Sequence, residues 1–127
     1  MSPQQTIFTA VRNNDPAAIT AAVSADSSVL DARDERGSTP LVLAGYLNHP
    51  ESVKALVEAG ADVNTVSGTG TALMGVCFKG YPDIARYLIE AGADVNISIE
   101  RMGTALTFAN MGKHTDVIEL LKANGAK

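Results

Sequence analysis

The chain has 127 residues, 46% hydrophobic and 19% charged, and its formal net charge at pH 7 is -4. This length and composition predict one soluble domain, and no run of about 18 apolar residues offers a membrane-spanning helix. The acidic balance and the scattered positions of the ten Lys and Arg residues disfavour nucleic acid as a partner.

The first unit, residues 1–33, is predicted to be a pair of helices. The apolar stretch Ile7 to Val11 belongs to the first helix, and Asn13 to Pro16 breaks the chain. From Ile19 to Val23 the apolar residues are spaced by three and four, as in a second helix. The exit, Ala25 to Asp31, is one residue longer than the later exits. We expect this unit to act as an N-terminal cap.

The second unit, residues 34–66, has clear start and stop signals for two helices. Thr39 is expected to cap the first helix with its hydroxyl, while Pro40 occupies the first helical position, where its missing N–H costs nothing. The segment Asn48 to Pro50 then breaks the chain and starts the second helix. Gly60 is expected to end that helix, because glycine suits a left-handed C-terminal cap.

The same pattern recurs in the third and fourth units, residues 67–98 and 99–127. The leucines of three similar openings stand 32 and 33 residues apart: Thr39-Pro40-Leu41, Thr71-Ala72-Leu73 and Thr104-Ala105-Leu106. The glycines of three similar closings have the same two intervals: Gly60-Ala61-Asp62-Val63-Asn64, Gly92-Ala93-Asp94-Val95-Asn96 and Gly125-Ala126. Two independent landmarks with one period indicate a repeat protein.

These openings and closings resemble the ankyrin repeat, most closely from Asp34 to Thr65. The resemblance covers essentially the whole chain and implies an all-α solenoid of four stacked helix-turn-helix units with short β-hairpin-like loops. Residues 1–127 would then form a single ankyrin-repeat domain, with the fourth unit as a C-terminal cap. The family's opening histidine is replaced at three positions: Val42, Met74 and Thr107.

The hairpin tips are not expected to be identical. Gly37 keeps the hairpin glycine of the second unit, whereas Thr69 and Met102 stand at the corresponding places later, each with a glycine one residue on. Those two tips should therefore be shaped differently. The segment Ser67 to Thr71 is rich in glycine but lacks the lysine and the spacing of a phosphate-binding loop, so we interpret it as a flexible hairpin tip.

No catalytic centre, cofactor site or metal site is predicted. His49 and His114 occupy equivalent turns two units apart, roughly 20 Å from each other, because stacked helices lie about 8–10 Å apart. They cannot share a metal. The lone Cys77 cannot form an internal disulfide, and its neighbours indicate a buried core residue. Asp62 and Asp94 belong to the repeated closing and are explained by local hydrogen bonding of the exit loop.

The resemblance implies that a partner protein binds the concave face formed by the inner helices and hairpin tips. Tyr46, Phe78 and Met111 stand at equivalent positions near the ends of three successive inner helices and are our candidate anchors. Their neighbours complete the candidate surface: Leu47, Lys79 and Arg12. A charged rim is expected at the tips: Glu35, Arg36, Thr69, Glu100 and Arg101. Packing into the interhelical turn is the alternative for the anchors, and an ordinary solvated turn is the alternative for each rim residue.

We therefore expect a non-catalytic protein-binding module, an adaptor or an inhibitor. The segment Met1 to Val11 lacks the features of a secretory signal, so we expect a cytoplasmic protein. We also expect it to be a monomer. Two alternatives stay open. One is an enzyme that uses Cys77 or His114 with a donor from a second copy of the chain, and the other is a self-associating scaffold.

Overall fold

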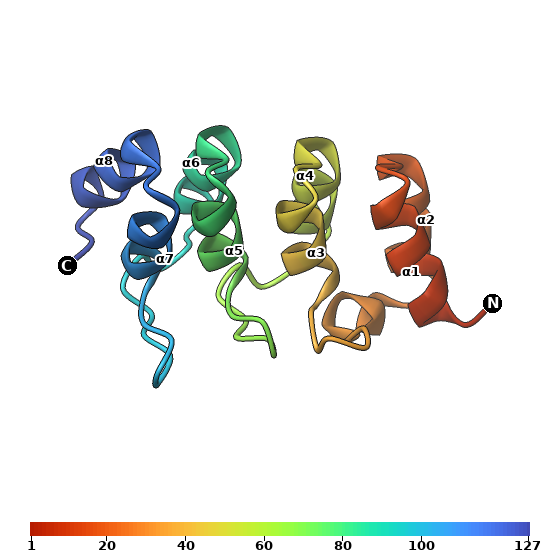
Figure 1. Cartoon of the computed structure of the whole chain (residues 1–127). Coiled ribbons are helices and arrows are strands. Elements are labelled where there is room, and N and C mark those ends of the chain that lie inside the picture. The colour runs from red at the N-terminus through yellow and green to blue at the C-terminus, as the bar shows by residue number, and fades with distance from the viewer.

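Four helix pairs stack side by side in chain order, with the N- and C-termini at opposite ends of the row (Figure 1). The computed structural model describes residues 1–127 and contains eight α-helices, one 3₁₀ helix and no sheet: α1 (Pro3–Arg12), α2 (Pro16–Ala25), η1 (Ser27–Asp31), α3 (Pro40–Tyr46), α4 (Pro50–Glu58), α5 (Ala72–Lys79), α6 (Pro82–Glu90), α7 (Ala105–Gly112) and α8 (Thr115–Ala123). This arrangement confirms the predicted all-α repeat solenoid.

The first helix of each pair, which we call the inner helix, begins at a hydroxyl cap. In the second unit the Thr39 hydroxyl accepts a hydrogen bond from the N–H of Val42 at 3.3 Å, and Pro40 is the first helical residue, as predicted. The other inner helices begin in the same way, at Ser2, Thr71 and Thr104. A residue with positive φ follows each inner helix and turns the chain back: Asn14, Asn48, Gly80 and Lys113.

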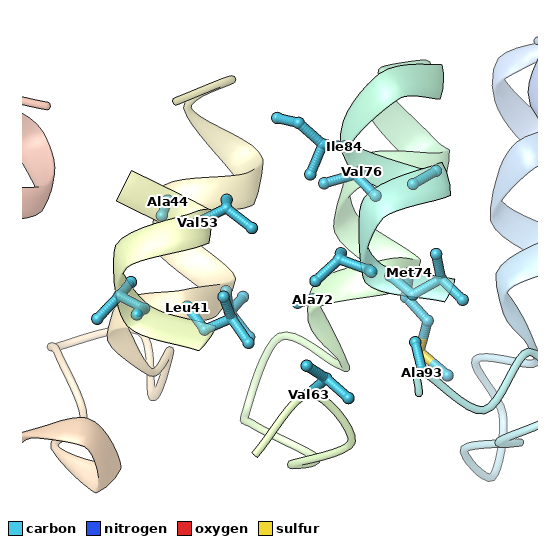
Figure 2. Close-up of a cluster of buried hydrophobic side chains, with 14 of the residues drawn as sticks. Leu41, Ala44, Val53, Val63, Ala72, Met74, Val76, Ile84 and Ala93 are labelled. Carbon is cyan, nitrogen blue, oxygen red and sulfur yellow. The ribbon is translucent and has the colours of Figure 1, made fainter. Parts of the chain in front are cut away.

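Apolar side chains fill the space between neighbouring pairs. Figure 2 shows Leu41 and Val53 of the second unit beside Val76 and Ile84 of the third. They belong to a cluster of 27 buried hydrophobic residues that extends through all four units. Equivalent leucines of the second helices are fully enclosed: Leu56, Leu88 and Leu121. The two helices of each pair contact each other and the helices of the neighbouring pairs, as is typical of repeat proteins.

Polar side chains also join adjoining units. The Asn64 side chain donates to the carbonyl of Gly92 at 3.2 Å and accepts from the N–H of Asp94 at 2.7 Å. Asn96 repeats both contacts one unit later, with Gly125 and Lys127. The asparagine that closes each inner repeat therefore links its own exit loop to the next.

The three hairpin tips differ, as predicted. Asp34 and Ser38 are joined by a backbone hydrogen bond in the second unit, and Ile99 and Gly103 are joined in the same way in the fourth. In the third unit the bridge joins Ser67 and Gly70, so this tip is one residue shorter. The fourth tip keeps the longer span but places Arg101 at a φ of 70°.

Two local features were not anticipated. The long exit of the first unit forms η1. Asp26 caps this helix, because its carboxylate accepts a hydrogen bond from the N–H of Ser28 at 3.0 Å. The Ser67–Gly70 tip, expected to be flexible, is closed by several hydrogen bonds. The Ser67 hydroxyl donates to the carbonyl of Gly70 at 2.7 Å, and the N–H of Gly68 donates to the neighbouring tip at the carbonyl of Gly37.

Candidate binding surface

The three candidate anchors lie on the face formed by the inner helices and the tips, which we call the inner face. Tyr46 is the last residue of α3, Phe78 lies near the end of α5, and Met111 lies near the end of α7. The three residues are 38%, 41% and 62% exposed. The inner helices pack side by side in the order α1, α3, α5 and α7, which brings the equivalent positions of successive units near one another.

All three anchors line one hollow of about 340 Å³, which we call the central hollow. Two residues of the predicted rim, Arg36 and Thr69, line it as well. The complete lining comes from the second, third and fourth units: Asp34, Arg36, Ser38, Val42, Leu43, Tyr46, Thr69, Met74, Gly75, Phe78, Phe108 and Met111. The walls are mainly apolar and the tip side is polar.

The central hollow lies where the third unit has a glycine at a position that is occupied by large side chains in the units before and after it. Leu43, Gly75 and Phe108 each lie two residues after the opening leucine of their unit. A Cβ atom on Gly75 would meet only Tyr46, with Cδ1 at 3.8 Å, so the space above this glycine is open. Phe108 closes the next side, where its ring meets that of Phe78 edge to face with centroids 6.3 Å apart.

The polar side of the central hollow is organised by hydrogen bonds between neighbouring tips. The Ser38 and Thr69 hydroxyl oxygens lie 2.7 Å apart. The Asp34 carboxylate accepts from the N–H groups of Arg36 and Ser38, both at 2.9 Å. The backbone of the second tip is therefore held in place, while the Arg36 side chain remains exposed.

The remaining candidates lie outside the central hollow. Lys79 borders it, with Nζ 5.0 Å from the centroid of the Tyr46 ring, whereas Leu47 is exposed beyond the end of α3. Arg12 and Glu35 line a second, more polar hollow beside α1. Glu100 and Arg101 are exposed at the fourth tip and line neither hollow. The structure thus brings five of the eleven predicted residues to the lining of one hollow.

Sequence reasoning missed the floor and one wall of the central hollow. Val42 and Met74 were considered only as replacements of the family's opening histidine, and Phe108 was not considered. A signal for Phe108 was present, because it lies three residues before Met111 and so on the same helical face. Gly75 gave no such signal, since a missing side chain becomes a site feature only when its neighbours are known.

The residues considered as catalytic groups, Cys77 and His114, are buried or hydrogen-bonded within the fold. Cys77 is fully enclosed, and its burial raises the pKa of the thiol to about 12. His114 Nε2 lies 2.9 Å from the carbonyl oxygen of Phe78, and His49 Nδ1 lies 3.0 Å from that of Val11. Both imidazoles therefore join the second helix of one unit to the inner helix of the unit before, which confirms their assignment to interhelical turns.

The two acidic closings have the predicted local role. Asp62 accepts from the N–H of Asn64 at 2.8 Å, and Asp94 accepts from the N–H of Asn96 at 2.9 Å. No group of three or more His, Cys, Asp or Glu side chains is placed to hold a metal ion. None of the helices has the length and apolar character needed to cross a bilayer.

Similarity to curated proteins is confined to part of the chain. The chain is 44% identical to alpha-latrotoxin-Lhe1a of Latrodectus hesperus over 45 residues. These aligned residues are 35% of this chain and 3% of that protein. The chain is 38% identical over 52 residues to alpha-latrotoxin-Lt1a of Latrodectus tredecimguttatus, 41% of this chain and 4% of that protein. The chain therefore spans only a few per cent of the length of these relatives.

A family model described as ankyrin repeats (3 copies) matches residues 7–99. Ankyrin repeats are generally protein–protein interaction modules and are typically not catalytic. The match covers well over half of the chain and extends from within α1 to beyond the end of α6, which is the region of the first three helix pairs. The chain belongs to the ankyrin-repeat family.

Proposed function

We propose that this chain is a non-catalytic adaptor or inhibitor that binds a partner protein through the central hollow and the tips around it. One observation carries the proposal: Tyr46, Phe78 and Met111 are substantially exposed yet converge on a single hollow. Exposed large apolar side chains gathered at one place typically mark interaction sites, whereas isolated ones do not.

The composition of the central hollow supports the same proposal. The chain has three Tyr, three Phe and no Trp, and Tyr46, Phe78 and Phe108 all line this hollow. Aromatic and Met side chains are enriched in interface cores, where a few of them carry most of the binding energy. The polar groups at the tips would then form the rim of the interface.

The enzyme alternative has little support. The Cys77 thiol is enclosed and has a raised pKa, so it lacks the accessible thiolate that a nucleophile needs. One ring nitrogen of His114 already contacts the carbonyl of Phe78. In place of a self-associating scaffold we propose a cytoplasmic monomer, and sedimentation analysis over a range of concentrations tests its oligomeric state.

The proposal is tested by affinity capture from lysate of the source cells. The immobilised baits are the wild type, the triple variant Y46S/F78S/M111S and a control, V66S. The control also removes an exposed apolar side chain, at a residue that is 48% accessible and does not line the central hollow. We expect wild type and control to retain the same protein and the triple variant to lose it. Equal capture by all three baits would place the binding surface elsewhere.

A further inference from the structure

The size of the central hollow limits what can occupy it. Its volume of about 340 Å³ is at the low end of the range of about 300–1,000 Å³ for sites that enclose a small ligand. In protein interfaces, pockets of this kind receive one anchoring side chain from the partner. The walls contributed by Tyr46, Phe78 and Phe108 are aromatic, so they suit an aromatic or long aliphatic side chain.

The charged groups beside the central hollow are not equally free. The Asp34 carboxylate already accepts two backbone N–H groups of its own tip, those of Arg36 and Ser38. The Arg36 guanidinium, by contrast, forms no ion pair. The single ion pair of the structure with a nitrogen–oxygen distance under 4.0 Å joins Arg86 and Asp83. Arg36 is therefore available to a negative group on a partner.

A second free cation lies at the opposite end of the inner helices. Lys79 is the last residue of α5, whereas Arg36 lies in the tip that precedes α3. The Lys79 ammonium forms no ion pair and lies over the Tyr46 ring. Arg36 in the lining and Lys79 beside Tyr46 are thus two positive charges without an ion pair, whereas the one carboxylate of the lining, Asp34, is hydrogen-bonded within its own tip.

We infer that the occupant is a peptide segment of a partner protein in which one bulky apolar side chain is flanked by Asp or Glu on both sides. This inference rests on the proposed function and names the chemistry of the partner. The apolar side chain enters the central hollow, and the flanking carboxylates meet Arg36 and Lys79. A basic flank places like charges together and is disfavoured, which gives selectivity as well as affinity.

The test uses three capped peptides, titrated into the ¹⁵N-labelled full chain and followed by amide chemical shifts. The first is Ser-Glu-Asp-Phe-Glu-Ser, the second replaces its three acidic residues by Lys, and the third replaces Phe by Ala. We expect the first peptide to shift the amides of Gly75, Phe78 and Phe108. It should bind at least about tenfold more tightly than the other two, a difference of about 1.4 kcal/mol, and weaken with added salt.

Variants then separate the two parts of the recognition. R36Q/K79Q should reduce the preference for the acidic peptide over the basic one to within about twofold, while the folded spectrum is retained. The control K54Q/K122Q makes the same change in net charge at exposed residues of the second helices, outside the central hollow and the tips, and should keep the preference. The triple variant Y46S/F78S/M111S should lose binding of the acidic Phe peptide.

The outcomes distinguish this inference from the proposed function. Equal binding of the acidic and basic Phe peptides at the central hollow would overturn the charge selection and leave the binding surface standing. Shifts confined to other residues, or no shifts with any peptide, would overturn the class of occupant. In that case capture by the wild type and not by Y46S/F78S/M111S would still support the surface, and equal capture by both would overturn it.

Discussion

The rings of Phe78 and Phe108 meet edge to face, with centroids 6.3 Å apart and planes at 87°. One ring belongs to α5 and the other to α7, so the contact joins two neighbouring units at the wall of the central hollow. Aromatic pairs in this geometry contribute about 0.5–1.5 kcal/mol beyond the burial of their surfaces. The same pair therefore stabilises the stack and shapes the surface that we propose for binding.

The anchors and the core leucines should respond differently to truncation. The variant Y46S/F78S/M111S should keep its far-UV helical signal and lose about 1–3 kcal/mol of stability, chiefly from the aromatic contact and partly buried area. Replacing any one of the enclosed leucines by Ala should cost about 2–5 kcal/mol: Leu56, Leu88 or Leu121. Urea unfolding measures both. An unfolded triple variant would assign the anchors to the core.

Two glycines in the inner helices should give opposite results when replaced by Ala. Gly75→Ala should raise the free energy of unfolding by about 0.5–1 kcal/mol, because Ala favours the helix and the new methyl meets only Tyr46, at 3.8 Å. Gly45→Ala should destabilise the chain, since its Cβ would lie 2.8 Å from Cγ1 of Val76. Thermal unfolding compares the pair. A loss of stability in Gly75→Ala would show that the space above it is not open.

The asparagine links between units should contribute measurably to stability. Asn64→Ala removes a donor to the carbonyl of Gly92 and an acceptor for the N–H of Asp94, so we expect a loss of about 1–2 kcal/mol. The control Asn124→Ala removes only a bond within its own segment, to the carbonyl of Leu120, and should cost less. Denaturant unfolding of both variants tests the difference. Equal losses would mean that Asn64 acts within its own loop alone.

The buried thiol should be unreactive in the folded chain. With a pKa of about 12, about one Cys77 side chain in 10⁵ is a thiolate at pH 7. Reaction with a thiol reagent should therefore be slow in buffer and fast in denaturant, at matched pH. Rapid modification of the folded protein would revive the enzyme alternative.

Cys77 should also make stability depend on alkaline pH. The unfolded thiol has a pKa of about 8.5, below the folded value of about 12, so the unfolded chain releases this proton first as pH rises. The contribution to stability is fully present below about pH 8.5 and falls by up to about 1.4 kcal/mol per pH unit until about pH 12. Cys77→Ala lacks this component. Its stability relative to wild type should rise from pH 8 to 10.5, and a constant difference would contradict the shift.

The helix pairs and their boundaries could be predicted from the sequence because local rules determine them. The Thr39 cap, the proline that starts α4 and the three-and-four spacing of apolar residues each act within a few positions of one another. The period of 32 or 33 residues then indicated that the pairs stack. The equivalence of Tyr46, Phe78 and Met111 followed from the same period.

The central hollow was decided only by the tertiary structure. Its lining combines residues of three units, so its shape depends on how closely successive helices approach. The absence of a side chain at Gly75 becomes an opening only because Tyr46 lies beside it and Phe108 stands at the equivalent position of the next unit. Spacing along the chain can place side chains on one face, but the distances between helices determine which of them enclose a space.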